Sequence, residues 1–205
     1  AKAVRSIGFP LSAALVEREL RIAQGTVVGC NHALENGIAF NIAGGTHHAF
    51  SDRGEAFCLL NDQAIAAQYL INQKKCHKIL IVDLDVHQGN GTAEIFQNNA
   101  DVITFSMHGQ SNYPFRKETS DYDIALPDKT DDITYLSILP ETLPELLNIH
   151  RPDFVFYLAG VDILGTDKLG KLGCTLEGCK TRDSYVLGLC KSLGIPVQVS
   201  MGGGY

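Results

Sequence analysis

The sequence lacks several features that mark particular classes of protein. No apolar run approaches the roughly 20 residues that a membrane-spanning helix needs. Residues 1–25 have the pattern of an amphipathic helix, so we expect no signal peptide there. Basic residues form no cluster, and the formal charge of −6 disfavours nucleic acid as a partner. We therefore expect a protein that binds neither membranes nor nucleic acids.

Cysteine pairs with metal-binding or redox spacing are also missing. The chain has 6 cysteines, and none of them belongs to a C-x-x-C motif. Their scattered positions predict free thiols in a reducing compartment, which favours a cytoplasmic location. The cysteines are Cys30, Cys58, Cys76, Cys174, Cys179 and Cys190.

The composition is that of a globular protein with one core. The chain has 205 residues, of which 45% are hydrophobic and 20% charged, without repeats or low-complexity tracts. This length suits one domain of ordinary size, so residues 1–205 are predicted to form a single domain.

Short apolar runs alternate with stretches of helical periodicity along the chain. The helices are expected at residues 10–24 (ending at Gly25), 62–72, 92–97, 131–150 (interrupted by prolines 140 and 144) and 177–193. The strands are expected at residues 37–43, 79–83, 102–108, 154–159 and 195–200. Residues 32–36 read as a loop or short helix, and residues 109–123 as a long polar loop. This alternation predicts an α/β fold with a largely parallel sheet, helices on both faces and a ligand site at the carboxyl ends of the strands.

Side chains that can bind a metal ion lie close together in the sequence where the central apolar run ends. Asp85 and His87 lie two residues apart, so in extended backbone they point to the same face, and Asp83 shares this parity. A carboxylate and an imidazole side by side at a strand end form half of a metal site.

Other predicted strands end in polar groups of the same kind. Two adjacent histidines, His47 and His48, follow a Gly-Gly turn, Asp162 follows the strand at 154–159, and Tyr205 follows three glycines. Because parallel strands end at one edge of a sheet, these groups are expected to meet there.

These residues predict metal-assisted hydrolysis. Asp85, His87 and Asp162 would supply three ligands and leave an open position, which is typical of catalytic zinc, although the ligands also suit Fe(II) or Mn(II). His48 and His47 would act as general base and acid, with Asp83 orienting one of them. The Tyr205 hydroxyl could donate to a developing oxyanion.

Five motifs, in order along residues 44–205, resemble the zinc-dependent histone deacetylase family. They are Gly-Gly-Thr-His-His, Phe57-Cys58, Asp-Leu-Asp-Val-His-Gln-Gly-Asn-Gly, Ala-Gly-Val-Asp and Gly-Gly-Gly-Tyr. Class IV and bacterial members are the most similar. The resemblance implies the arginase/deacetylase fold and removal of an acyl group from lysine or from a small acylated amine.

The resemblance also implies roles for particular residues. Asp85, His87 and Asp162 match the zinc ligands, and Tyr205 matches the tyrosine that polarises the acyl carbonyl. His47 and His48 match the tandem histidines, with Asp83 as the partner of the first and His48 as the base. Phe57, Tyr113 and Gly203 match the wall of the acyl-lysine tunnel. A structural K⁺ or Na⁺ would use the region of Asp83, Asp85, His87, Ser106 and Met107, and a second one the carbonyls of Phe96, Asn99 and Val102.

Three departures from the family pattern stand out. Asn90 occupies the position where many members have an aspartate that partners the second histidine, and a neutral amide should leave His48 less basic. Ala56 replaces a glycine that commonly precedes the tunnel phenylalanine. The chain is also shorter than the family's catalytic domains, so we expect it to be truncated at both ends and weakly active.

Other functions stay open at this stage. An arginase-like enzyme with two manganese ions would need a carboxylate at position 89, which is glycine. An acetylpolyamine-type enzyme would act on a small molecule, and an inactive fragment could still bind acylated lysine. The sequence leaves the preferred acyl chain, from acetyl to longer groups, undetermined.

Overall fold

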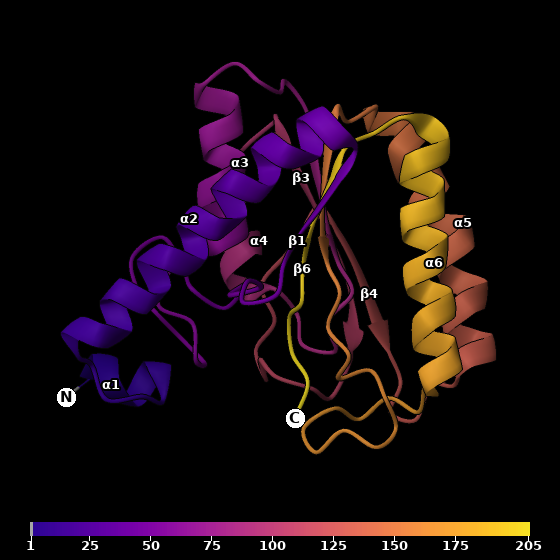
Figure 1. The fold of residues 1–205 in the computed structure, drawn as a ribbon. Coiled ribbons are helices and arrows are strands. Elements are labelled where there is room, and N and C mark those ends of the chain that lie inside the picture. Colours follow the sequence, from indigo (N-terminus) through magenta and orange to yellow (C-terminus); the bar gives the residue numbers. More distant parts are fainter. Residues whose placement is uncertain (1) are drawn as a thin grey trace.

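The computed structural model describes residues 2–205 as alternating helices and strands (Figure 1). The helices are α1 (Lys2–Ile7), α2 (Ala13–Asn36), α3 (Asp62–Asn72), α4 (Asn90–Phe96), α5 (Asp132–His150) and α6 (Leu176–Leu193). The strands are β1 (Ile38–Asn41), β2 (Ile79–Asp83), β3 (Val102–Gly109), β4 (Tyr122–Leu126), β5 (Phe154–Leu158) and β6 (Val197–Ser200).

The strands form one parallel sheet between two layers of helices. The sheet has 6 strands in the order β1-β6-β5-β2-β3-β4, and every neighbouring pair is parallel. Helices α2, α3 and α4 cover one face, and α5 and α6 cover the other (Figure 1). The protein is therefore a single α/β domain with a fully parallel sheet, which confirms the predicted fold class.

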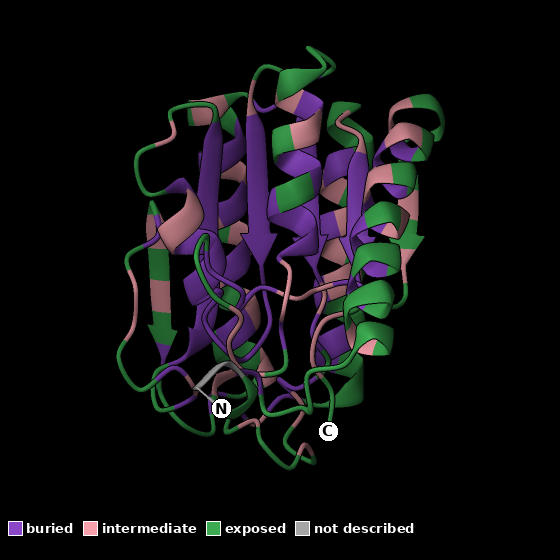
Figure 2. Ribbon diagram, turned by 90° about the vertical axis from the view of Figure 1, so that its left-hand side faces the viewer, coloured by how far each residue is buried: buried purple, intermediate pink, exposed green. Residues whose placement is uncertain are grey.

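The core has one part on each face of the sheet. Leu80 and Val82 of β2 pack with the inward faces of α5 and α6, whereas Ile79 and Ile81 pack with α2 and α3. Successive residues of a strand point to opposite faces, so an uninterrupted apolar run serves both sides. Every residue of β2 and β5 is buried, as Figure 2 shows for the central strands.

Helix α2 is longer than predicted. It runs from Ala13 to Asn36 and does not stop at Gly25, and the predicted loop or short helix at residues 32–36 is its last part. Its ends carry the caps: the Ser12 side chain accepts a hydrogen bond from Leu15 N, and Gly37 adopts the left-handed conformation with φ 88°. A glycine inside a helix costs about 1 kcal/mol, which is too little to end a helix that packs against a sheet and α3.

Two further elements differ from expectation. Strand β4 lies partly inside the predicted polar loop at 109–123 and pairs with the end of β3. Its first four residues alternate between half-buried and exposed positions and only Leu126 is buried, so it lacks the apolar run that marks the central strands. Helix α5 continues through Pro140 and Pro144 without interruption. The carbonyl of Pro140, which Pro144 cannot bond because it has no N–H, accepts a hydrogen bond from Tyr185 Oη on α6 at 3.4 Å.

The strand ends that carry the polar motifs share one edge of the sheet. The arrows of the strands in Figure 2 point toward the end of the molecule where the loops and the C-terminal residue lie. All six cysteines are unpaired, as predicted, and all six are buried. Among residues 2–205, no helix combines the length and apolar character that crossing a membrane requires.

Candidate metal centre and catalytic pocket

Four neighbouring strands deliver the candidate site. His47 and His48 follow β1, Asp85 and His87 follow β2, Asp162 follows β5, and Tyr205 follows β6. These strands are adjacent in the sheet order β1-β6-β5-β2. Parallel pairing thus brings together side chains that are up to 158 positions apart, because 205 − 47 is 158.

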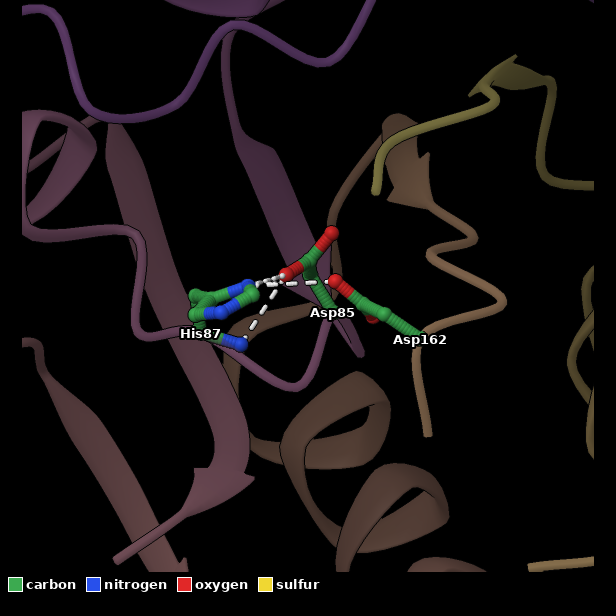
Figure 3. A group of neighbouring side chains, drawn as sticks. All are labelled: Asp85, His87 and Asp162. Atoms are coloured by element: carbon green, nitrogen blue, oxygen red, sulfur yellow. Dashed lines mark hydrogen bonds and ion pairs between the residues drawn. The ribbon is translucent and has the colours of Figure 1, made fainter. Parts of the chain in front are cut away.

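Asp85, His87 and Asp162 form a compact buried cluster (Figure 3). His87 Nδ1 lies 3.0 Å from Asp85 Oδ1 and 3.1 Å from Asp162 Oδ2. One ligand atom from each residue lies within 4.8 Å of the others, and no second group of this kind occurs in the described part of the chain. The structure thus brings together the three residues that the sequence predicts as metal ligands.

The charges of this cluster favour a bound cation. Burial and the neighbouring Asp85 raise the pKa of Asp162 to about 7. Burial alone would lower the pKa of His87, but its hydrogen bonds to Asp162 and Asp85 raise it to about 10. Two carboxylates and one imidazole at such short range carry excess negative charge once the imidazole is neutral, and a divalent cation would compensate it. Oxygen and nitrogen donors in this ratio fit Zn²⁺ or Fe²⁺.

The backbone of the last loop passes directly against this cluster. Gly203 N donates a hydrogen bond to Asp85 Oδ2 at 2.7 Å, which orients the carboxylate. A methyl group at position 203 would overlap Asp162 Oδ2, so only glycine fits there. Asp162 is held in turn by Val86 N, which donates to its Oδ1 at 2.9 Å.

His47 is paired with a carboxylate. Its Nδ1 lies 2.7 Å from Asp83 Oδ2, and its Nε2 lies 3.9 Å from Asp85 Oδ1. Burial would lower the pKa of His47, but the charges of Asp83 and Asp85 outweigh it and raise the pKa to about 9. His47 is therefore suited to carry a proton at neutral pH.

His48 is paired with an amide instead. Its Nδ1 lies 2.7 Å from Asn90 Oδ1, and its ring is 4.1 Å from that of His47. Burial and the neighbouring His47 hold the pKa of His48 well below its ordinary value. The surroundings of the two adjacent histidines thus shift their pKa values in opposite directions, upward for His47 and downward for His48.

A cavity of about 430 Å³ opens onto the cluster. His48, His87 and Tyr205 line it, together with the predicted wall residues Phe57 and Tyr113. The Tyr113 ring meets His48 edge-on at 5.0 Å, and the Tyr205 ring meets His87 edge-on at 6.1 Å. Gly203, the third predicted wall residue, lies against the carboxylates and not among the residues that line the cavity.

Several contributors to the site were not predicted. Residues 5–8 of the N-terminal segment line the cavity. In this segment, Ile7 O accepts a hydrogen bond from Phe57 N at 2.9 Å. Glu55 accepts a hydrogen bond from Asn90 Nδ2 at 3.2 Å and another from the Tyr113 hydroxyl. An acidic residue two positions before Phe57 was the only sequence signal for this contact.

A buried arginine joins the two loops that carry the candidate metal ligands. Arg182 on α6 is fully buried, and its Nη1 donates to the carbonyls of Leu84 at 3.1 Å and Gly160 at 2.7 Å. These carbonyls precede Asp85 and Asp162 closely in the chain, so Arg182 fixes both loops to one another. A charged residue on an otherwise apolar helix face was its sequence signal.

The predicted monovalent cation sites stay predictions. Asp83 pairs with Ser106 in the register of β2 and β3, which places these two residues next to one another. Ser106 Oγ lies 2.9 Å from His108 Nδ1.

The fold and the site are those of an α/β protein with a candidate metal centre at its strand ends, and comparison with known proteins identifies its family. Residues 4–205 match the family described as Histone deacetylase domain. An uncharacterized protein of Picosynechococcus sp. is 50% identical over 204 residues, which cover 100% of this chain and 68% of that protein. The chain therefore belongs to the histone deacetylase family.

Relatives whose names state a function are less similar in sequence and considerably longer. Histone deacetylase 2 of Arabidopsis thaliana is 32% identical over 184 residues, which cover 88% of this chain and 48% of the plant protein. The acetoin utilization protein AcuC of Staphylococcus aureus is 32% identical over 176 residues, covering 80% of this chain and 45% of AcuC. The chain spans less than half the length of these two relatives.

Proposed function

We propose that the protein is a zinc-dependent amidohydrolase that removes an acyl group from a lysine side chain. The observation that carries this proposal is the buried cluster of Asp85, His87 and Asp162 beside the tandem histidines, at the base of a cavity with aromatic walls. Membership of the histone deacetylase family supports deacetylase chemistry. Residues 1–205 would act as one catalytic unit.

The proposed roles follow from the hydrogen bonds of each residue. A divalent cation held by Asp85, His87 and Asp162 would polarise the acyl carbonyl and lower the pKa of the attacking water. His48, neutral because its pKa is depressed, would take the proton of that water. His47, kept protonated by Asp83, would stabilise negative charge and supply a proton to the leaving amine.

Tyr205 would donate its hydroxyl hydrogen to the acyl oxygen. Burial, followed by the charges of Asp85 and Asp162, raises the pKa of Tyr205, so the hydroxyl keeps the hydrogen that it donates. The backbone N of Tyr205 donates to Asp167 Oδ2 at 2.6 Å, which ties the residue to the loop after β5.

Zinc is the proposed metal, and Fe²⁺ also suits the ligands. The proposal also includes a structural K⁺ or Na⁺ near the carboxyl end of β2. It further includes a similarity to class IV enzymes. A small acylated amine is the alternative substrate. Both substrates present an amide at the end of a narrow aliphatic stem, so the proposed chemistry is the same for either.

Hydrolysis of a series of acyl amines tests the proposal. Peptides with acetyl-lysine to myristoyl-lysine, an acetylated polyamine and free arginine would be incubated with wild type, His48→Ala and Tyr205→Phe. We expect metal-dependent release from the acyl-lysine peptides, lowered by at least about a hundredfold in both variants. Turnover of the polyamine alone would favour the alternative substrate, and turnover of arginine would favour an arginase-like enzyme. Tight peptide binding without release would contradict catalysis.

A further inference from the structure

Glu55 lies at the end of a chain of polar contacts that begins at His48. Its side chain is 23% exposed, and its Oε1 accepts hydrogen bonds from Asn90 Nδ2 at 3.2 Å and from the Tyr113 hydroxyl. Its other oxygen, Oε2, lies 3.5 Å from Arg53 Nε. The carboxylate therefore contacts a tunnel wall residue and the partner of His48 at the same time.

The backbone around Glu55 holds this carboxylate in place. Glu55 and Cys58 exchange two backbone hydrogen bonds of 2.9 Å across a tight turn. The same turn is tied to the N-terminal segment, because Ala56 N donates to Ser6 O at 2.9 Å. A carboxylate on such a turn is a fixed group and not a freely rotating surface charge.

Asn90 by itself cannot determine the tautomer of His48. An amide offers an oxygen that accepts and a nitrogen that donates, and rotation by 180° exchanges them with almost no change of shape. If the oxygen faced His48, Nδ1 would carry the ring hydrogen, whereas if the nitrogen faced it, Nε2 would carry that hydrogen. Only the first tautomer leaves Nε2 free to accept a proton from water.

Glu55 resolves this ambiguity because a carboxylate only accepts hydrogen bonds. The amide nitrogen of Asn90 must face Glu55, so the amide oxygen must face His48. His48 Nδ1 then donates to that oxygen over 2.7 Å, and Nε2 keeps its lone pair.

We propose that Glu55 is a positioning residue that selects the Nδ1–H tautomer of His48 through Asn90. The pair Glu55–Asn90 thereby fixes the hydrogen on Nδ1 of His48, the same ring atom at which Asp83 contacts His47 directly. The consequence for turnover depends on the proposed function, whereas the tautomer of His48 does not. The test separates the two.

Nuclear magnetic resonance of ¹⁵N-histidine-labelled, metal-free protein gives the first readout. We expect His48, assigned by comparison with His48→Gln, to show one tautomer with the hydrogen on Nδ1. In Glu55→Gln, both orientations of Asn90 can be satisfied, so His48 should populate both tautomers. An Nε2–H tautomer in wild type, or an unchanged Nδ1–H spectrum in Glu55→Gln, would overturn the proposal.

Kinetics with a compensating substitution give the second readout. Glu55→Gln should lower kcat by about ten- to a hundredfold with KM within about twofold. Adding Asn90→Asp to Glu55→Gln places a carboxylate directly on His48, with the introduced amide at position 55 as its donor, and should restore most of kcat and the single tautomer. Glu94→Gln is the matched control, because the Glu94 carboxylate holds Ser51 of the same loop by hydrogen bonds of 2.8 and 3.1 Å.

The outcomes distinguish the two proposals. A lowered kcat in Glu55→Gln that Asn90→Asp does not restore would mean that Glu55 is merely structural, which contradicts the inference. An inactive wild type that nevertheless shows the expected tautomer and its loss in Glu55→Gln would contradict the proposed function while it supports the inference.

Discussion

At the scale of single residues, the site depends on what stands next to each histidine. His47 and His48 are adjacent in the chain and equally buried, yet the pKa of His47 is raised to about 9 and that of His48 is lowered. A carboxylate stands beside the first and an amide beside the second. The sequence indicates the histidine pair, whereas the role of Glu55 depends on a contact between distant loops and needed the structure.

Ala56 carries local backbone strain. Its φ is 42° and that of Phe57 is 68°, so both residues occupy the left-handed region in the turn that presents Phe57 to the cavity. An L-residue in this region costs roughly 1–2 kcal/mol because its Cβ approaches the carbonyl oxygen. The departure from glycine that the sequence shows at this position therefore affects the turn itself.

Ala56→Gly should increase the free energy of unfolding by about 0.5–1 kcal/mol, because glycine adopts the left-handed region without strain. Urea unfolding followed by circular dichroism measures the change. Ala49→Gly, at a buried position outside the left-handed set, is the control and should destabilise. A loss of stability in Ala56→Gly would show that the strain is absent.

At the scale of elements, helix α3 fixes the loop that carries the histidines. Asp62, in the first turn of α3, accepts hydrogen bonds from Gly45 N at 2.9 Å and from Thr46 N and Oγ1 at 2.8 Å. Its second oxygen accepts from Thr26 Oγ1 on α2 at 2.6 Å. One buried carboxylate thus joins two helices to the turn before His47.

Asp62→Asn should lower the free energy of unfolding by about 2–3 kcal/mol and kcat by at least tenfold. The amide nitrogen would face donors and leave them unpaired, so the turn would lose its support. Chemical denaturation and steady-state kinetics measure the two effects. Asp128→Asn, at an exposed position after β4, is the matched control. Wild-type stability in Asp62→Asn would contradict this role.

The elements that the sequence predicts well are those whose burial is uniform. Strands β2 and β5 are apolar runs buried on both faces, and they lie where the sequence places them. Strand β4 was missed because an edge strand with exposed positions has no such run. The end of α2 was misplaced because packing against the sheet overrides the helix-breaking tendency of Gly25.

At the scale of the whole molecule, every cysteine is buried: five lie in the two core layers, and Cys58 lies in the loop before α3. Burial raises the pKa of all six thiols, to about 11 for Cys190 and to about 12 for Cys76 and Cys174. The thiolate is the form that reacts with disulfides, so these groups are both inaccessible and largely protonated.

Native protein should therefore react slowly with Ellman's reagent, and all six thiols should react promptly in guanidinium chloride. The absorbance of the released thionitrobenzoate measures both rates. A surface cysteine introduced at Ser137, an exposed position of α5, is the positive control. Prompt reaction of several native thiols would contradict the burial of the cysteines.

The fold brings four strand ends to one candidate site, and we propose that Asp85, His87 and Asp162 hold a single metal ion there. A zinc titration tests that proposal most directly. Protein treated with a chelator would receive increasing zinc while the hydrolysis of an acetyl-lysine peptide is recorded. We expect activity to rise from near zero to a plateau at one equivalent per chain, and no such rise in Asp162→Asn. Activity that persists in the chelator, or a plateau at two equivalents, would contradict a single metal held by Asp85, His87 and Asp162.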